Sequence, residues 1–448
     1  VVSDIERGLI ARYLHRMLTR SELPLRTQRS IVHWLFNQRY SFNLKMPEPL
    51  IAAIADNSSG ERTDVEMLDA LTAHRLPLLA LLDQAALETP RPEPLATNIE
   101  LLTAELGLSR AAWKVIGAIA CHNRFDMVRN LGETMANTFT RLAHLIALMV
   151  AEPRGTVEQL LHPAGPLVGN GIIRLSDSWG LWGQVAIPQQ LNMCLDQTHG
   201  SLASLRDAML GVPAVTDNVA GDYDHVRPDR DLMIKVLSGA VREGAPGINI
   251  LLYGPPGSGK TEMTKVVAAA AGLTLYAVSE QSSWGGGEAD RTERLATLVF
   301  AQQILKGTSN AALLFDEMED VAWQFMKRGG SKAYLNRLLE TNPVPILWTS
   351  NNIADIDPAL LRRMTLAVEL RLPPPVQRER IIAQLSRRMG VDLSEAEISH
   401  LARRVDGTPA VLANALRAAR LSGGGADAVE QAALGIQRAA FGIEVRHA

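Results

Sequence analysis

One stretch near the middle of the chain constrains the fold more than any other: INILLYGPPGSGKTEMTKVVAAAAG, at residues 248–272. An apolar run predicts a buried strand, Gly254–Thr261 follows the pattern G-x-x-x-x-G-K-[ST], and an alanine-rich helix ends at Gly272. Glycines in such a loop let backbone N–H groups surround phosphate oxygens, and the helix N-terminus adds free donors and a favourable dipole. A chance glycine-rich turn does not explain the whole octamer between a strand and a helix. The stretch therefore predicts a P-loop.

The P-loop and the first turn of its helix supply the predicted nucleotide contacts. We expect Lys260 to reach the β- and γ-phosphates of ATP and the Thr261 hydroxyl to coordinate Mg²⁺. The residues expected to contact the nucleotide are Pro255, Pro256, Gly257, Ser258, Gly259, Lys260, Thr261 and Glu262.

A second apolar run, AALLFDEMED at residues 311–320, predicts another buried strand that ends in an acidic pair. We expect Asp316 to hold the Mg²⁺ shell and Glu317 to orient or deprotonate the attacking water. An acidic pair can also simply cap the next helix. An apolar run ending in two acids downstream of a P-loop is a specific combination, however, and it favours catalysis.

A third strand, PILWTSNN at residues 345–352, ends in polar residues. We expect either Asn351 or Asn352 to lie beside the γ-phosphate. The run DIDPALLRRM follows and places Arg362 next to Arg363. Adjacent arginines are either plain surface charge or arginine fingers that reach the nucleotide of a neighbouring subunit, where a finger is worth about 10³–10⁵ in rate. The position favours fingers, and Arg363 is the preferred one.

Together these motifs resemble those of the AAA+ ATPases. GPPGSGKT is similar to their Walker A motif, LLFDE to Walker B, TSN to sensor 1, and DIDPALLRR to the second region of homology of the clade that includes katanin and the proteasomal ATPases. The resemblance covers about residues 222–448 and leaves residues 1–212 outside. It implies Mg²⁺-dependent hydrolysis of ATP to ADP and phosphate, in which Glu317, Asn351, Lys260 and the arginines are catalytic.

The resemblance also implies a fold for the C-terminal half. Residues 232–385 are expected to form a large α/β P-loop ATPase domain, a three-layer sandwich with a five-stranded parallel sheet, and residues 386–448 a helical lid. In the family the adenine packs between these domains, near the segment matching YDHV, so His225 and Val226 are expected to contact the base. Within the lid, the pattern at Ser394 predicts a capping box.

The first half of the chain shows helical periodicity. It predicts a helical domain over residues 1–90 and a connection at the proline-rich stretch 88–98. A second block, 99–212, passes from helices to short strand-like runs at 165–188, an order of elements typical of a winged-helix domain. Residues 213–231, rich in Pro, Gly and Asp, are expected to be a linker.

Charge and composition limit the classes of partner. The net charge is −3, and residues 151–200 hold two Arg and no Lys against four acidic residues, so nucleic acid is a disfavoured partner. We expect the N-terminal region to recruit a protein client instead. Cys121 and Cys194 are the only cysteines, which fits a reducing compartment and predicts a cytoplasmic location. The longest apolar run, LIALMVA, is too short to span a bilayer.

The stretch SSWGGGEAD at residues 282–290 lies between the predicted second strand and the helix after it. In the clade named above, this connection carries a pore loop of aromatic, hydrophobic and glycine residues. Trp284, Gly285 and Gly286 match that pattern with glycine at the middle position. Alternatively, Trp284 packs on its own domain or in a subunit interface. The later run FMKRGGSKA is either a second pore loop or a solvated connection.

These observations predict a ring-forming, ATP-driven AAA+ protein that remodels, unfolds or disassembles a protein partner, with a homohexamer as the expected assembly. A nucleic-acid-directed AAA+ motor or loader is one alternative, which the low positive charge disfavours. A nucleotide-gated assembly scaffold that threads nothing is the other.

Overall fold

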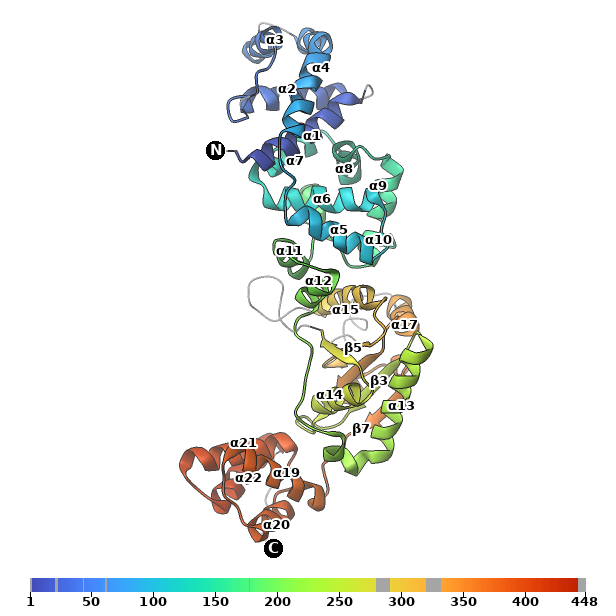
Figure 1. Ribbon diagram of the computed structural model, residues 1–448, viewed down its shortest axis with the longest axis vertical. Helices are drawn as coiled ribbons and strands as arrows, with labels where there is room; N and C mark the ends of the chain where they lie inside the picture. Colours follow the sequence, from blue (N-terminus) through green and yellow to red (C-terminus); the bar gives the residue numbers. More distant parts are fainter. Residues whose placement is uncertain are drawn as a thin grey trace. The chain divides into compact units, whose positions relative to one another are not determined.

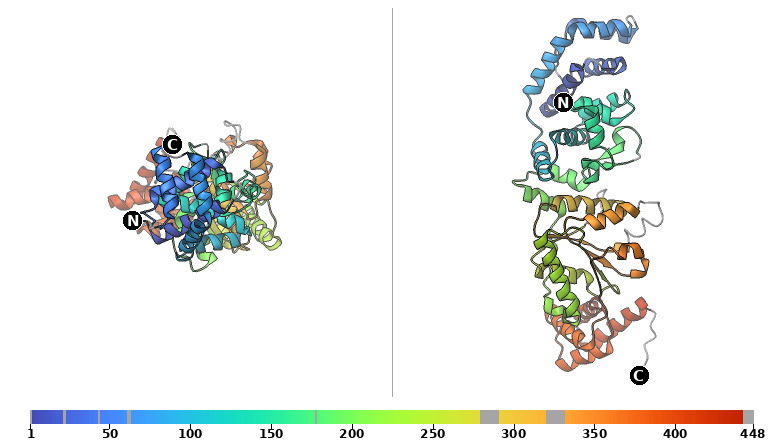
Figure 2. Two further views of the ribbon diagram at one scale, coloured as in Figure 1. Left: turned by 90° about the horizontal axis from the view of Figure 1, so that it is seen from above. Right: turned by 90° about the vertical axis from the view of Figure 1, so that its right-hand side faces the viewer.

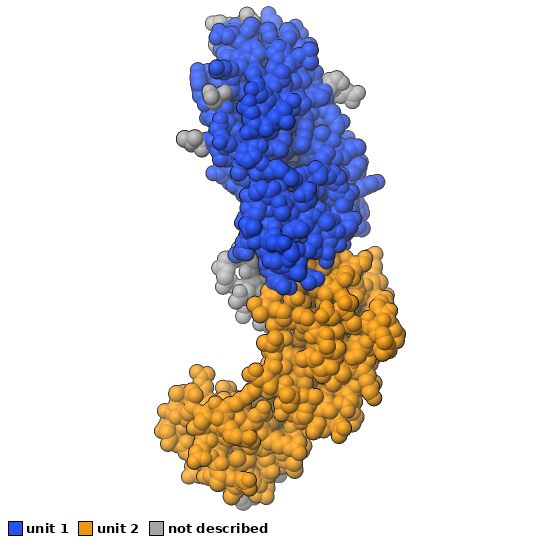
Figure 3. Space-filling view, in the orientation of Figure 1, with its two compact units in different colours: residues 1–209 blue, residues 210–448 orange. Residues whose placement is uncertain are grey.

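The computed structural model describes residues 2–20, 23–42, 44–60, 63–176, 178–278, 291–319 and 332–441 (Figure 1). The chain divides into two compact units, residues 1–209 and 210–448 (Figure 3). Each unit buries apolar side chains of its own. Within the described ranges, no helix combines the length and the apolar composition that crossing a membrane requires.

The regular elements of the first unit, within its described residues, are helices and one short antiparallel pair of strands, β1 (Arg174–Leu175) and β2 (Val185–Ala186). Its helices are α1 (Asp4–Thr19), α2 (Leu25–Gln38), α3 (Glu48–Ser59), α4 (Asp64–Leu87), α5 (Leu95–Glu105), α6 (Arg110–Arg124), α7 (Asp126–Ala136), α8 (Leu142–Val150), α9 (Arg154–Leu160), α10 (Pro166–Gly169), α11 (Gln189–Leu195) and α12 (Leu202–Leu210). In place of the strand-like runs expected from the sequence, the structure has one pair of strands of two residues each. The winged-helix interpretation stays a prediction.

The proline-rich stretch at 88–98 connects helices of one unit, whereas the sequence suggested separate regions at 1–90 and 99–212. Helix α1 packs against α4 and also against α7 and α8, which lie beyond that stretch. Gly8 of α1 lets the start of the proline-rich stretch approach this helix closely, because a Cβ atom there would lie 1.7 Å from Thr89 Oγ1. Close backbone approach of this kind is a common reason for glycine inside a helix.

The second unit is built on a five-stranded parallel sheet with the strand order β4-β5-β6-β3-β7. The strands are β3 (Asn249–Tyr253), β4 (Thr274–Ala277), β5 (Ala311–Phe315), β6 (Ile346–Ser350) and β7 (Leu366–Glu369). The helices around the sheet are η2 (Ala220–Val226), α13 (Arg227–Glu243), α14 (Lys260–Ala270), α15 (Arg291–Leu305), α17 (Lys332–Thr341), η3 (Ile353–Asp355) and α18 (Pro358–Leu361). The predicted α/β fold is confirmed, although α13 begins inside the segment expected to be a linker.

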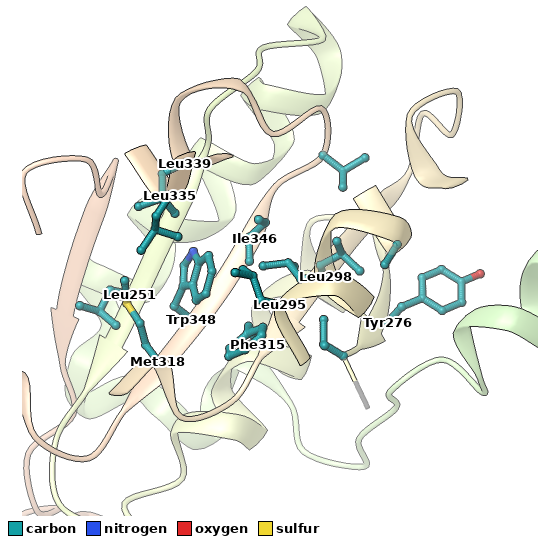
Figure 4. Close-up of a cluster of buried hydrophobic side chains, with 14 of the residues drawn as sticks. Leu251, Tyr276, Leu295, Leu298, Phe315, Met318, Leu335, Leu339, Ile346 and Trp348 are labelled. Carbon is teal, nitrogen blue, oxygen red and sulfur yellow. The ribbon is translucent and has the colours of Figure 1, made fainter. Parts of the chain in front are cut away.

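Helices cover both faces of the sheet (Figures 1 and 2), and side chains of the strands alternate between the two cores. Leu251, Phe315 and Trp348 belong to the core under α15 and α17 (Figure 4). Ile250 and Leu252 belong to the core under α13 and α14. This period of two, with both faces buried, is what a parallel sheet between helices requires. The result is a three-layer sandwich.

The lid is a helical domain with its own core. Its helices are α19 (Pro375–Met389), α20 (Glu395–Arg404), α21 (Pro409–Ser422) and α22 (Ala426–Phe441). Ile382 of α19 is fully buried in this core, so the lid begins at α19 and not at residue 386 as the sequence suggested. The capping box expected at Ser394 is confirmed, because Ser394 Oγ accepts from the backbone N–H of Glu397 and Glu397 in turn accepts from that of Ser394.

Candidate functional site

Three of the predicted motifs meet at one edge of the sheet. Strands β5, β6 and β3 are neighbours and run parallel, so their carboxyl ends lie together. The P-loop follows β3, Asp316 follows β5 and Asn351 follows β6. Ligands of open α/β sheets bind at this edge.

The P-loop is held in place by close contacts that only glycine allows. A Cβ atom on Gly254 would lie 2.2 Å from the carbonyl oxygen of Leu370. Gly257 has φ +75°, and a Cβ atom there would lie 2.8 Å from the Cβ of Ala410 in the lid. The N–H of Ala410 donates to the Gly257 carbonyl at 3.3 Å. The loop that the sequence assigns to phosphates therefore also contacts the first turn of lid helix α21.

Lys260 is buried at this edge of the sheet. Its Nζ atom donates to the carbonyl oxygens of Gly254 at 3.0 Å and Pro255 at 3.1 Å, and to Asn351 Oδ1 at 2.8 Å. Burial lowers the pKa of Lys260, and the nearby carboxylates, Asp316 foremost, oppose that shift. Of the two candidate asparagines, Asn351 is therefore the one that contacts Lys260. Asn352 caps η3 instead, accepting from the Ala354 N–H at 3.1 Å.

Asp316 links the P-loop helix to the third strand. Its Oδ2 accepts from the Thr261 hydroxyl at 2.9 Å, and its Oδ1 accepts from the Thr349 hydroxyl. Hydroxyl and carboxylate oxygens suit Mg²⁺, which binds few protein oxygens and keeps several waters when it serves a phosphate substrate. Thr261 and Asp316 therefore fit the magnesium role that the sequence assigned to them.

Glu317 has an unusual backbone conformation. Its φ is +60°, which is uncommon for a residue with a side chain and often marks a functional site. The backbone N–H of Glu317 donates to Thr349 Oγ1 at 3.2 Å. Whereas β5 is buried throughout, the Glu317 side chain is exposed. The turn thus brings a carboxylate out of the sheet directly after the magnesium candidate.

Two residues at this edge were missed by the sequence analysis. Glu319 Oε1 accepts from the Ser350 hydroxyl at 2.8 Å and from the N–H groups of Asn351 and Asn352, the latter at 3.0 Å. Thr349 accepts from the N–H of Glu317 and donates to Asp316. The available signals were the third acid in DEMED and the hydroxyls in TSNN, but neither specifies a partner.

The adjacent arginines differ in their surroundings. Arg363 is tied to its own subunit, since its Nε donates to Glu340 Oε1 at 2.9 Å and its Nη1 donates to the Ala359 carbonyl at 2.6 Å. Arg362 is exposed, and its side chain makes no hydrogen bond or ion pair with any described residue.

A cavity of about 130 Å³ lies between the P-loop and the lid. Its walls include Tyr223 and His225 of η2 and Ile381 and Leu385 of α19. Burial lowers the pKa of His225, with Asp224 opposing, so the ring is neutral near pH 7. A concave, mainly apolar site with a few polar groups is typical of a base-binding pocket.

The predicted nucleotide contacts fall into two groups around this cavity. Ser258, Gly259, Glu262 and His225 line it. The others do not line it, namely Pro255, Pro256, Gly257, Lys260, Thr261 and Val226; Val226 packs against the core under α13 and α14. Tyr223 lines the cavity and donates to the Gly259 carbonyl at 3.3 Å, a contact that the sequence did not predict.

The predicted pore-loop residues Trp284, Gly285 and Gly286 lie outside the described residues, as does most of FMKRGGSKA.

Comparison with known protein families agrees with the motifs. Residues 250–372 match the family described as "ATPase family associated with various cellular activities (AAA)". The C-terminal half of this chain therefore contains an AAA ATPase domain, and the resemblance inferred from the motifs is confirmed.

Several similar proteins are spastins. The spastin of Gallus gallus is 30% identical over 178 residues, which cover 36% of this chain and 28% of that protein. The spastin of Anopheles gambiae is 26% identical over 177 residues, covering 36% of this chain and 21% of that protein. The match thus spans less than a third of either relative.

Two solved structures are also similar to this chain. A FIGL-1 AAA domain in complex with ADP is 18% identical, with 47% of this chain and 75% of that chain covered and a TM-score of 0.39. A structure reported for katanin self-assembly is 19% identical, with 48% and 77% covered and a TM-score of 0.39.

Proposed function

We propose that this protein hydrolyses ATP and uses the energy to remodel a protein partner, as a ring of identical subunits. The observation that carries the ATPase part is the joining of three motifs at one sheet edge. Lys260 contacts Asn351 at 2.8 Å, and Thr261 contacts Asp316 at 2.9 Å. Phosphoryl transfer needs a P-loop, acidic residues at one strand end and polar residues at another.

The proposed chemistry assigns one role to each group. Free N–H groups at the start of α14 and the Lys260 ammonium bind and orient the phosphates. Thr261 and Asp316 would hold Mg²⁺, which would supply positive charge beside the phosphate oxygens. Glu317 accepts the proton of the attacking water, and Asn351 positions that water or the γ-phosphate. Glu319 positions Asn351, because its carboxylate accepts a hydrogen bond from the backbone N–H of Asn351.

The ring is proposed from the arginines. An arginine finger acts on the nucleotide of a neighbouring subunit, and so it needs an assembly. The sequence favoured Arg363, but the ion pair of Arg363 with Glu340 occupies it within its own subunit. The exposed Arg362 supports the finger role better.

The client-binding part of the proposal concerns residues 1–212 and Trp284. We propose that the N-terminal unit recruits the partner and that Trp284 contacts a polypeptide. A Trp284→Ala variant is expected to keep basal ATP hydrolysis and to lose partner remodelling. If remodelling and partner-stimulated hydrolysis survive, the threading part fails and a nucleotide-gated scaffold is supported instead.

The central experiment is a Glu317→Gln variant of the full chain, which should bind ATP and not turn it over. Glu243→Gln is the matched control, because Glu243 is an exposed residue of α13 that pairs, among the described residues, only with its neighbour Arg242. The ATP-locked assembly should retain its protein partner during purification. Normal hydrolysis by Glu317→Gln would overturn the assignment of the base. Salt-sensitive binding of DNA, with no protein partner retained, would overturn the remodelling role.

A further inference from the structure

The N-terminal unit contains a cavity of about 90 Å³ where α1, α5 and α6 meet the segment that precedes α5. Four cationic residues line it: Arg12, Arg16, Arg91 and Lys114. No acidic residue is among the described residues that line the cavity. Most of the other walls are apolar and include Leu95 of α5. The cavity thus combines positive charge with an apolar interior.

Two of the four cations are neutralised by nearby acids. Lys114 Nζ lies 2.5 Å from Glu152 Oε1, and Arg91 lies 3.7 Å from Glu100. Neither acid lines the cavity. Arg12 and Arg16 are therefore the two cations of the cavity whose charge these pairs do not neutralise.

Among the described residues, the side chains of Arg12 and Arg16 donate hydrogen bonds only to backbone carbonyl oxygens. Arg12 Nε donates to the Gly8 carbonyl at 3.2 Å, and Arg16 Nη1 donates to the Met149 carbonyl at 3.3 Å. The two guanidinium groups stand one helical turn apart on α1, where like charges repel. Burial lowers the pKa of Arg16, and the charge of Arg12 lowers it further, against Tyr13 and Glu152. An anion in the cavity would relieve this repulsion.

Two buried donors at the cavity also have no acceptor within the described part of the chain. These are Arg12 Nη2 and the indole Nε1 of Trp113. A buried N–H group without an acceptor costs about 1–3 kcal/mol, so native proteins rarely leave two at one place. The thiol of Cys121 does not supply a negative charge, because burial raises its pKa to about 12.

We propose that this cavity recognises a carboxylate, presented next to an apolar side chain, in an acidic segment of a protein partner. Arginine forks bind carboxylates with two parallel hydrogen bonds, and the apolar walls suit the neighbouring side chain. The volume of about 90 Å³ is of the size that a single side chain fills. The identity of this occupant rests on the proposed role of the unit in recruiting a partner, whereas the site itself does not depend on ATP hydrolysis.

The test uses the full chain and a fluorescein-labelled peptide of alternating leucine and glutamate, with binding followed by fluorescence anisotropy. The same peptide with glutamine in place of glutamate is the neutral control. The acidic peptide should bind at least tenfold more tightly than the neutral one. The double variant Arg12→Gln with Arg16→Gln should lose at least tenfold in affinity. Arg26→Gln, an exposed arginine of α2 outside the cavity, should keep the affinity of the unmodified chain.

A second variant closes the cavity without removing charge. Gly117 lies in α6, lines the cavity and has nothing within 4 Å of a Cβ position, so Gly117→Leu fills the space and should also improve helix propensity. Gly155→Leu is the matched control, since Gly155 lies in α9 with equally open surroundings and outside the cavity. Gly117→Leu should abolish peptide binding, and Gly155→Leu should not change it.

Three results would overturn the proposal: equal affinity for the acidic and neutral peptides, binding that Gly117→Leu leaves unchanged, or binding of hexanoate at the cavity with none of the peptide. The last would assign the site to small free carboxylates. ATP hydrolysis by the same variants should remain normal, which separates a failure here from a failure of the proposed function.

Discussion

The ammonium of Lys260 donates to the side-chain carbonyl of Asn351 at 2.8 Å, although 91 residues separate them in sequence. The contact exists because β3 and β6 are paired in parallel, which places the P-loop beside the end of β6. The same ammonium is the group expected to bind the β- and γ-phosphates. Phosphate binding must therefore compete with, or rearrange, the bond between Lys260 and Asn351.

This relationship predicts different kinetic effects for the two adjacent asparagines. Asn351→Ala is expected to lower the kcat of ATP hydrolysis by about 10²-fold with a small change in ATP affinity, since a preorganised polar group near the reacting atoms is lost. Asn352→Ala removes the cap of η3 and a hydrogen bond to Asp355, both away from Lys260, and should keep kcat within about threefold, because a lost cap costs about 1 kcal/mol of stability. Steady-state kinetics with Mg²⁺–ATP would decide, and equal losses would contradict the assignment.

The contact of the P-loop with the lid predicts a difference between two glycines of similar backbone conformation. Gly257 and Gly272 both have φ +75°, so alanine costs about 1–2 kcal/mol of strain at either position. Only at Gly257 would the new Cβ atom also overlap the lid, at Ala410 and Thr408. Gly257→Ala should therefore lower thermal stability more than Gly272→Ala and should weaken ATP binding as well. Equal melting temperatures and equal ATP affinities for the two variants would show that the lid contact has no energetic weight.

Much of the ATP site could be predicted from the sequence because it consists of short contiguous motifs. GPPGSGKT and LLFDE each combine a strand end with polar residues, and parallel strands bring such ends together. The partner of Lys260 could not be chosen between Asn351 and Asn352, because that choice depends on the direction of one side chain after β6. The positioning role of Glu319 likewise depends on one hydroxyl and two backbone N–H groups at the end of another strand.

Domain boundaries were harder to predict, for a physical reason. Proline-rich stretches break helices, but a broken helix does not imply a separate core. The stretch at 88–98 lies within one unit, and its Thr89 approaches Gly8 of α1, a contact of which the sequence gives no sign. The start of the lid was predicted too late in the chain for a similar reason. The periodicity of α19 indicates that Ile382 is buried, but it does not indicate which domain buries it.

The surroundings of the two arginines predict which one acts between subunits. Arg362→Ala should lower the ATP hydrolysis of the assembled protein by about 10³-fold, the usual effect of losing a finger. Arg363→Ala removes a partly exposed ion pair with Glu340 and should cost about 0.5 kcal/mol of stability with little effect on turnover. Mixing Arg362→Ala subunits with Glu317→Gln subunits should restore part of the activity, because each variant keeps the group that the other lacks. A tenfold or greater loss confined to Arg363→Ala would reverse the assignment.

A buried histidine of the N-terminal unit predicts how its stability depends on pH. His122 is buried and stacks on Trp182, with ring centroids 3.9 Å apart. Burial lowers the pKa of His122 from 6.5 to about 4. Below pH 6.5 the unfolded chain therefore binds a proton that the folded chain excludes, and acid favours unfolding. The free energy of opening should be constant above about pH 6.5 and fall by about 2–3 kcal/mol as the pH drops towards 4.

Hydrogen–deuterium exchange of α6, corrected for the intrinsic pH dependence of exchange, measures that free energy in the full chain. His122→Phe keeps an aromatic ring against Trp182 and removes the titrating group, so it should flatten the profile between pH 4 and 6.5. His162→Phe is the control, because His162 is exposed and its replacement should leave the profile unchanged. A pH dependence that persists in His122→Phe would mean that another group in the unit controls its acid sensitivity.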